Sequence, residues 1–525
     1  MKMRLKLIGI VILYILAVIQ IQAEVKLPAI FGDHMVLQRG QSDPIWGWDT
    51  PGTEITVAFA EQTNSTIAGA DGKWMVKLAP LLANATPQVM TIAGTTTREI
   101  KDVLVGEVWV CSGQSNMQFP LCDSGGFGGD YNGDLEAAEA NLPNLRLIMV
   151  PNVGTQELQN DFKGQWQVSS PESAGKFSAV GFLYGRYLHQ ILGIPVGLID
   201  NAWGGSAAEA WVRRSVLEND SRFQKLMAAT MQKEVECLST NARRNYESAL
   251  TQWKIAVEKV KGQFVNPPYK PQSPEEWLVG NKRPGNIYNG VLHPILGYGI
   301  KGVIWYQGES NADRADEYAN LFPFLIEQWR KEWGQGDFPF YWVQLANYKD
   351  VQPLPKESTW AELREAQTKT MQLTNTGQAV IIDLGEGRDI HPKNKHDVAA
   401  RLVRWALVKD YGMKMFYRSP EFKQLTINSN RVVVEFNCFG SKKLRPFGTD
   451  EVKGFAVCGE NKVWQSATGK IVGENKVEVW SDKVLSPMAI RYAWADNPIC
   501  NLFSLEGLPV TPFRTDTYSN NKNHK

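Results

Sequence analysis

Six short apolar runs between residues 106 and 411 constrain the fold of this chain more than any other feature. They lie at residues 107–111, 145–150, 196–199, 303–306, 340–345 and 379–383, and stretches of helical character separate them. Strands that are apolar on both faces and alternate with helices are typical of a parallel sheet covered by helices on both sides. The pattern therefore predicts an α/β protein whose main domain has three layers and a central parallel sheet.

The 525 residues are too many for one compact domain, and the pattern changes on both sides of this region. Short alternating runs separated by turn residues predict an N-terminal β-sandwich domain over residues 24–105. The α/β domain follows at 106–411, a C-terminal β-rich region at 412–517 and a polar tail at 518–525. Both β regions are expected to be accessory, sandwich-like units. Within the α/β domain, residues 219–262 predict one long amphipathic helix and residues 263–284 an irregular loop.

The N-terminus has the form of a secretory signal peptide. Lys2, Arg4 and Lys6 precede an apolar stretch at residues 7–19, and the segment Gln-Ile-Gln-Ala at 20–23 supplies a cleavage site. We therefore expect residues 1–23 to be removed and the chain to be exported, to the periplasm or outside the cell; an uncleaved anchor is the alternative. No later stretch approaches the ~20 apolar residues that span a bilayer, so no stable membrane insertion is expected after cleavage.

Charge and cysteine content exclude some functions. The net charge of +1 gives no overall field that would attract nucleic acid. The six cysteines show no Cys-x-x-Cys spacing, so they predict no metal site. Cys438 and Cys458 can form a disulfide across neighbouring strands, and free buried thiols are the alternative. The oligomeric state is not readable from the sequence.

Ser115 is the candidate nucleophile. It lies in the segment Gly-Gln-Ser-Asn-Met at residues 113–117, directly after the first buried strand. In open α/β sheets, sites form at the carboxyl ends of strands. A glycine before the serine permits a tight turn that exposes Oγ and leaves backbone N–H groups available. Alone this is weak evidence, because serine is also a common helix cap.

Three further polar segments follow predicted strands of the same domain. They are Trp-Gly-Gly-Ser at 203–206, Trp-Tyr-Gln-Gly-Glu-Ser-Asn at 305–311 and Asp-Ile-His-Pro at 389–392. Glycine amides and the Gln307 side chain can donate hydrogen bonds to an oxyanion, and His391 can act as a general base. The four segments together supply the groups that acyl transfer requires.

These segments resemble the conserved blocks of the sialate O-acetylesterase family, which belongs to the SGNH hydrolase superfamily. Residues 31–39 and 363–367 are also similar to it, so the resemblance covers nearly the whole mature chain. It implies that Ser115 is the nucleophile, that His391 is the base and that an O-acetylated sugar or glycan is the substrate. It implies no cofactor or metal. The remaining implied residues either form the oxyanion hole or bind substrate: Asn116, Gly204, Gly205, Gln307, Glu309 and Arg364.

The chain departs from the superfamily at two positions. Gln307 stands where the superfamily uses Asn, and Arg388 occupies the position three residues before the histidine where an Asp is usual. Asp389, two residues before His391, is the candidate third member of the site. A backbone carbonyl or Glu309 can orient His391 instead.

Three other functions are compatible with these residues. The first is deacetylation of a plant polysaccharide such as xylan, xyloglucan or pectin, since the shared segments handle the acetyl group rather than the sugar. The second is glycoside hydrolysis by Glu309 and Asp313. The third is carbohydrate binding without catalysis, which 18 tryptophans would suit. The resemblance favours an esterase that removes O-acetyl groups from sialic acid through an acetyl-serine intermediate.

Overall fold

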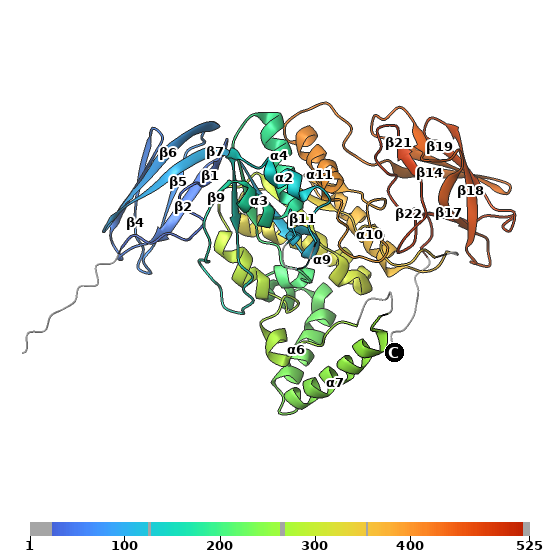
Figure 1. Ribbon diagram of the computed structural model, residues 1–525, viewed down its shortest axis with the longest axis horizontal. Coiled ribbons are helices and arrows are strands. Elements are labelled where there is room, and N and C mark those ends of the chain that lie inside the picture. Colours follow the sequence, from blue (N-terminus) through green and yellow to red (C-terminus); the bar gives the residue numbers. More distant parts are fainter. Residues whose placement is uncertain (1–23, 124–125, 127, 263–267, 353–354, 518–525) are drawn as a thin grey trace, which may run out of the picture.

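The computed structural model describes residues 24–517 except 124–125, 127, 263–267 and 353–354. The predicted signal peptide and the polar tail lie outside the described residues. The N-terminal β unit, the α/β domain and the C-terminal β unit lie in a row along the longest axis of the molecule (Figure 1).

The central sheet has the predicted parallel core. Its strands run in the order β13-β12-β11-β7-β10-β8, each parallel to its neighbours, and the short strand β9 adds an antiparallel edge beside β8. The domain is therefore α/β, with a mixed rather than purely parallel sheet. The strand bounds are β7 (Thr97–Gly113), β8 (Leu142–Met149), β9 (Gln167–Ser169), β10 (Val196–Asp200), β11 (Gly302–Tyr306), β12 (Phe340–Val343) and β13 (Thr376–Ala379).

Helices cover both faces of this sheet. Trp109 and Cys111 of β7 pack into one core with α4 (Ala179–Leu192) and α11 (Lys395–Lys409). Val108 and Val110 point to the other core, with α9 (Ala315–Trp333) and α10 (Thr359–Lys369). Because side chains alternate along a strand, a run that is apolar throughout fills both cores. Shorter helices complete the domain: α1 (Ser115–Gln118), α2 (Gly133–Ala138), α3 (Pro171–Lys176) and α5 (Arg214–Glu218).

The last predicted strand is displaced. Residues 379–383 were expected to form it, but β13 spans Thr376–Ala379 and the apolar run continues beyond the sheet. Val380 and Ile382 pack into the core of the C-terminal β unit, whereas Ile381 packs into the α/β core. The run is apolar because it is buried between two units, and burial alone does not specify a strand.

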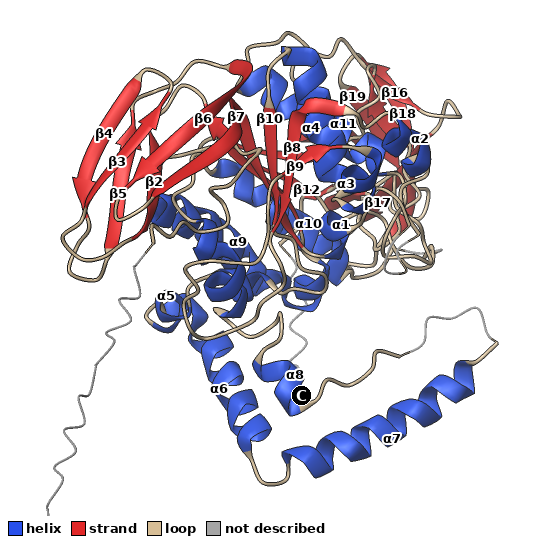
Figure 2. Cartoon of the chain, turned by 60° about the vertical axis from the view of Figure 1, so that its left-hand side comes forward, coloured by secondary structure: helices blue, strands red, loops and turns tan. Residues whose placement is uncertain are grey.

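The N-terminal unit shares a strand with the α/β domain. The first half of β7 pairs with β1 and β6, and its second half pairs with β10 and β11, so one continuous strand crosses residue 105. A separate sheet of β2 and β5 completes the unit (Figure 2). The remaining bounds are β1 (Val36–Gln38), β2 (Asp43–Trp48), β3 (Glu54–Phe59), β4 (Gln62–Ile67), β5 (Lys73–Leu78) and β6 (Asn84–Ala93).

The C-terminal unit is an antiparallel sheet of order β14-β15-β19-β18-β17-β20-β22, accompanied by the pair β16-β21. Cys438 and Cys458 are not bonded, and all six cysteines are free thiols. The strands are β14 (Glu421–Asn428), β15 (Arg431–Asn437), β16 (Leu444–Pro446), β17 (Val452–Cys458), β18 (Gln465–Gly473), β19 (Lys476–Trp480), β20 (Ala489–Tyr492), β21 (Leu502–Ser504) and β22 (Phe513–Arg514).

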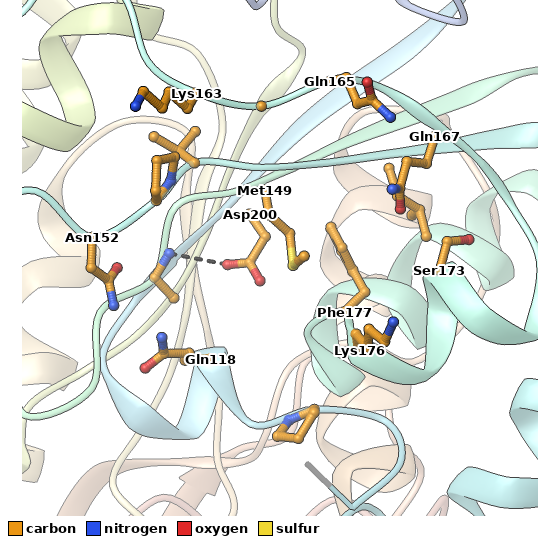
Figure 3. A pocket seen from close by; sticks show the side chains of 16 residues that line it. Gln118, Met149, Asn152, Lys163, Gln165, Gln167, Ser173, Lys176, Phe177 and Asp200 are labelled. Carbon is orange, nitrogen blue, oxygen red and sulfur yellow. Dashed lines mark hydrogen bonds between the residues drawn. The ribbon is translucent and has the colours of Figure 1, made fainter. Parts of the chain in front are cut away.

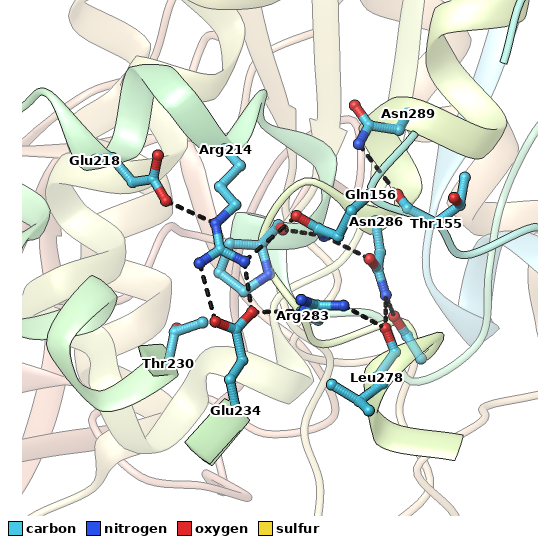
Figure 4. A network of polar contacts seen from close by, with 12 residues as sticks. Thr155, Gln156, Arg214, Glu218, Thr230, Glu234, Leu278, Arg283, Asn286 and Asn289 are labelled. Atoms are coloured by element: carbon cyan, nitrogen blue, oxygen red, sulfur yellow. Dashed lines mark hydrogen bonds and ion pairs between the residues drawn. The ribbon is translucent and has the colours of Figure 1, made fainter. Parts of the chain in front are cut away.

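A helical arm projects from the α/β domain (Figure 1). The single helix predicted over 219–262 is instead two, α6 (Gln224–Leu238) and α7 (Ala242–Val260), and α7 buries none of its residues. The predicted loop over 263–284 contains a short helix, α8 (Pro274–Leu278). Glu234 of α6 accepts hydrogen bonds from Arg214 and Arg283, which anchors the arm to the domain (Figure 4). Across the described part of the chain, no helix combines the length and apolarity needed to cross a bilayer.

Candidate active site

Ser115 stands at the carboxyl end of β7, where the strand turns sharply into α1. Gly113 has φ +131°, and a Cβ there would lie 2.2 Å from the backbone oxygen of Tyr306 on the neighbouring strand. Only glycine fits this close approach, so the turn depends on it. Ser115 is the first residue of α1, and its backbone N–H therefore has no acceptor within the helix. The side chain is brought to the edge of the sheet where sites of this fold class form.

His391 approaches Ser115 from the opposite end of the sequence. It lies in the loop that precedes α11, and its Nε2 is 2.8 Å from Ser115 Oγ. This distance is that of a hydrogen bond between a nucleophile and its base. The structure thus brings together the serine and the histidine that the sequence singled out.

Asp389 lies beside His391 but does not reach its ring at hydrogen-bond distance. Its Oδ1 accepts the backbone N–H of His391 at 2.9 Å and lies 3.6 Å from Nδ1. The Asp389 side chain is 45% exposed. It shapes the loop and places a negative charge near the ring, which is weaker than the buried Asp–His contact of a Ser-His-Asp triad. Glu309, the other candidate partner, accepts a hydrogen bond from Asn116.

Asn116 joins the serine loop to the histidine loop. Its Nδ2 donates to Glu309 Oε1 at 2.7 Å and to the carbonyl oxygen of Ile390 at 3.0 Å. Its Oδ1 accepts from the ammonium of Lys395 at 2.6 Å. Because Ile390 directly precedes His391, this one amide holds the two reactive side chains in a common frame.

Lys395 is the residue of the site that sequence reasoning missed. Its side chain is fully buried, and its Nζ lies 4.4 Å from the ring centre of Phe119 and 5.4 Å from that of Tyr306. One indication was available, because Lys395 is the first residue of α11 and cations are disfavoured at helix N-termini. A lysine kept at such a position points to a specific partner, but the sequence does not reveal that this partner is Asn116.

These buried charges alter the acidity of the site. Burial lowers the pKa of Lys395 to about 7, although Glu309 and Asp130 oppose the shift. Burial raises the pKa of Glu309. Burial together with the charge of Lys395 lowers the pKa of His391, and the charge of Asp389 opposes this only in part. His391 is therefore held in the neutral form that accepts a proton.

The glycine pair at 204–205 lies against the serine. A Cβ on Gly204 would sit 3.4 Å from Ser115 Cβ and 2.9 Å from Gln118 Oε1, so the absent side chain leaves room beside the nucleophile. The Gly204 N–H donates to Gln118 Oε1 at 2.8 Å. Gly205 has φ +70°, a left-handed backbone conformation that favours glycine.

Gln307, the predicted oxyanion donor, has other hydrogen-bond partners in this structure. It is fully buried, and its Nε2 donates to the carbonyl oxygen of Ser206 and to Asn311 Oδ1. Its Oε1 accepts the hydroxyl of Tyr318. Both N–H groups of the amide are therefore already hydrogen-bonded within the protein.

Arg364 is also not a substrate-binding residue. Its guanidinium is fully buried and donates to four backbone oxygens, those of Leu345, Ala346, Ala495 and Asp496. These carbonyls belong to the α/β domain and to the C-terminal unit, so Arg364 fastens one to the other.

Two other expectations concern metals and glycoside hydrolysis. Within the described ranges, no group of three or more His, Cys, Asp or Glu side chains is arranged as metal ligands. Asp313 is exposed, whereas Glu309 is tied to Asn116. Burial raises the pKa of Glu309, as a general acid requires, but Ser115 and His391 are hydrogen-bonded to each other.

Comparison with known proteins finds similar carbohydrate esterases. Residues 275–401 match the family model described as "Carbohydrate esterase, sialic acid-specific acetylesterase". The chain is 31% identical to a sialate O-acetylesterase of Mus musculus over 75% of each chain, and 28% identical to that of Homo sapiens over 91% of this chain and 90% of the human one. A crystal structure of a carbohydrate acetylesterase from Xanthomonas citri superposes with a TM-score of 0.79 at 36% identity, covering 94% of this chain and all of the other.

Fold, site and relatives together define a hydrolase of carboxylic esters. The match to the mouse enzyme, at 31% identity over 75% of each chain, is sufficient to assign the chain to a family. The chain belongs to the sialate O-acetylesterase family.

Proposed function

We propose that this enzyme removes O-acetyl groups from sialic acid, with Ser115 as nucleophile and His391 as general base. The observation that carries the proposal is the 2.8 Å contact between Ser115 Oγ and His391 Nε2. The substrate is supported by the family model, whose description names sialic acid, and by the sialate O-acetylesterases among the relatives.

The reaction begins when Ser115 Oγ attacks the acetyl carbonyl carbon and His391 takes the hydroxyl proton. The carbonyl oxygen becomes an oxyanion, which we propose is stabilised by the backbone N–H groups of Ser115 and Gly204. Each such donor is typically worth about 3 kcal/mol. The tetrahedral intermediate collapses, the C–O bond to the sugar breaks, and His391 gives its proton to the departing sugar oxygen. An acetyl-serine remains.

Water completes the cycle. His391 removes a proton from water as the water oxygen attacks the acetyl carbon, and then returns that proton to Ser115 Oγ as acetate leaves. Gln118 takes part in this cycle because, in the free enzyme, its Oε1 accepts the hydrogen bond that the Gly204 N–H later donates to the oxyanion. It must give up this hydrogen bond when the oxyanion forms.

Asp389 acts in this proposal as a nearby charge and a loop anchor, which its 3.6 Å distance to Nδ1 and its exposure support. Asn116 and Lys395 hold the serine and histidine loops together. The four strand-end segments also support placing the α/β domain in the SGNH hydrolase superfamily.

A panel of substrates tests the proposal. Acetate release is measured from O-acetylated N-acetylneuraminic acid, acetyl-xylan and acetyl-xyloglucan, each with the wild type and with Ser115→Ala. We expect the highest kcat/KM on the sialic acid and no release by the variant. Release that survives Ser115→Ala refutes the nucleophile, whereas a preference for xylan or xyloglucan refutes only the substrate.

We also propose export of the enzyme, supported by the basic residues and apolar stretch at the N-terminus. N-terminal sequencing of the protein recovered from outside the cytoplasm is expected to begin at Glu24. Recovery of a chain that still carries residues 1–23 would instead support the uncleaved anchor.

A further inference from the structure

A cavity of about 560 Å³ opens at the carboxyl edge of the central sheet (Figure 3). Three of the residues that line it end an element: Met149 ends β8, Asp200 ends β10, and Gln118 ends α1. The volume lies within the range of sites that hold small molecules, and the position is where α/β sheets bind ligands. Ser115 itself is not part of the lining.

The cavity nevertheless adjoins the nucleophile. Gln118 is three residues after Ser115 on α1, about 4.5 Å along the helix axis. The same Gln118 accepts the N–H of Gly204, whose missing side chain would touch both Gln118 and Ser115. A substrate with its acetyl group at Ser115 therefore has its next atoms at the rim of this cavity.

Asp200 forms the floor of the cavity and is suited to hold hydroxyl groups. Its Oδ1 accepts the N–H of Ala202 at 3.0 Å, and Figure 3 shows the carboxyl directed into the open space. No ion pair joins it to a basic side chain within the described residues. Burial raises its pKa to about 7, although the N–H groups of Ala202 and Ser178 oppose the shift. At neutral pH it is therefore protonated in a large fraction of molecules and repels an anionic ligand little.

The rim carries positive charge and an apolar surface. Lys163 and Lys176 line the cavity on different sides (Figure 3). Lys176 pairs with Glu172 at the protein surface, where both side chains are mostly exposed, and such a pair exchanges readily with another carboxylate. Met149 is 44% exposed and offers an apolar contact inside the cavity.

We propose that this cavity binds the acidic sugar unit of the substrate, with the sugar carboxylate at one of the two rim lysines, Lys163 or Lys176, and its hydroxyl groups at Asp200. The inference rests on the proposed esterase function and specifies how that site selects its substrate. A carboxylate-bearing sugar matches the combination of two cations at the rim, a hydroxyl acceptor at the floor and an apolar side chain between them. A neutral acetylated sugar offers no negative charge to either lysine.

The test compares the double variant Lys163→Met/Lys176→Met with the wild type on two substrates, O-acetylated N-acetylneuraminic acid and O-acetylated N-acetylglucosamine. We expect the ratio of kcat/KM for the acidic over the neutral sugar to fall at least about tenfold, as for loss of a charge-assisted hydrogen bond. The double variant Lys73→Met/Lys77→Met removes two exposed lysines of β5 and is expected to keep the wild-type ratio. An unchanged ratio in the first variant overturns the proposal.

A binding measurement tests the cavity assignment independently of which substrate the enzyme deacetylates. N-acetylneuraminic acid and glucuronic acid are titrated calorimetrically into Ser115→Ala, with and without the two lysine substitutions. Binding of either acid that weakens at least about tenfold in the lysine variant supports the cavity assignment, and the tighter of the two identifies the acid. Absence of binding, or binding that the substitutions leave unchanged, refutes it even if the enzyme deacetylates sialic acid. If the wild type cleaves p-nitrophenyl acetate but no acetylated sialic acid, the proposed substrate fails and the glucuronic acid titration still judges the cavity.

Discussion

The Nε2 atom of His391 lies 2.8 Å from the Oγ of Ser115, although 276 residues separate them in the sequence. One residue, Asn116, binds both loops and is itself bound by the buried Lys395. The relationship between serine and histidine is therefore maintained by a polar network beneath the site. The electrostatics of that network lead to measurable consequences.

The first prediction concerns pH. His391 accepts a proton only when it is neutral, and its pKa lies below the ordinary value because it is buried beside Lys395. We expect kcat/KM on p-nitrophenyl acetate to stay high as pH falls through the ordinary histidine range, about 6.5, and to drop at lower pH. A rate constant that is flat from pH 8 to pH 4 would rule out His391 as the base. Circular dichroism over the same range controls for unfolding.

The second prediction concerns Lys395. Burial lowers its pKa to about 7, so the ammonium is charged in the acid range where His391 titrates. Removing this charge in Lys395→Met or Lys395→Gln raises the pKa of His391, and we expect the acid limb of kcat/KM to move to higher pH in both variants. The glutamine keeps a donor toward Asn116, which separates the effect of charge from that of the lost hydrogen bond.

Lys393→Met provides the matched control for this experiment. Lys393 lies two residues from His391, but its charge is not among the causes of the lowered histidine pKa. We expect the acid limb of the kcat/KM profile of Lys393→Met to coincide with that of the wild type. If the acid limb of kcat/KM in both Lys395 variants also coincides with that of the wild type, the charge of Lys395 does not lower the pKa of His391.

The third prediction concerns Asp389. In a Ser-His-Asp triad, replacing the Asp by Asn lowers kcat by about 10⁴. Asp389 is 3.6 Å from Nδ1 and 45% exposed, so solvent screens much of its charge. We expect Asp389→Asn to lower kcat by less than about tenfold and to shift the acid limb to lower pH, because the charge that raises the histidine pKa is lost. A loss near 10⁴ would show that Asp389 contacts the ring during the reaction.

The sequence was sufficient to single out Ser115 and His391, the serine and histidine that the structure brings into contact. Ser115 and His391 follow strands of one parallel sheet, and the carboxyl ends of parallel strands meet at one edge. Position along a strand does not reveal which way a side chain points, however. Gln307 follows β11 as expected, yet it turns inward, and Arg364 is buried between two units.

The polar network was not predictable for a different reason. Lys395 and Asn116 are 279 residues apart, and nothing in the local pattern of either residue identifies the other as its partner. The displaced strand β13 has the same origin, since Val380 and Ile382 are apolar through contact with the C-terminal unit rather than through strand pairing. The local pattern of apolar residues indicates which side chains are buried. The Lys395–Asn116 contact and the bounds of β13 depend instead on contacts between segments that are far apart in the sequence.

The last prediction distinguishes the two roles of Gln307. If its amide stabilised the oxyanion, Gln307→Leu would lower kcat about 10² to 10³ and leave the fold intact. The structure instead places the amide between Ser206, Asn311 and Tyr318. We therefore expect Gln307→Leu to lower the free energy of unfolding by about 1–3 kcal/mol for each buried partner left unpaired, measured by urea denaturation. Ser310→Ala, which removes one hydrogen bond to Gly205 from the same loop, is expected to cost less. If Gln307→Leu is as stable as the wild type but its kcat is reduced a hundredfold, Gln307 is an oxyanion donor after all.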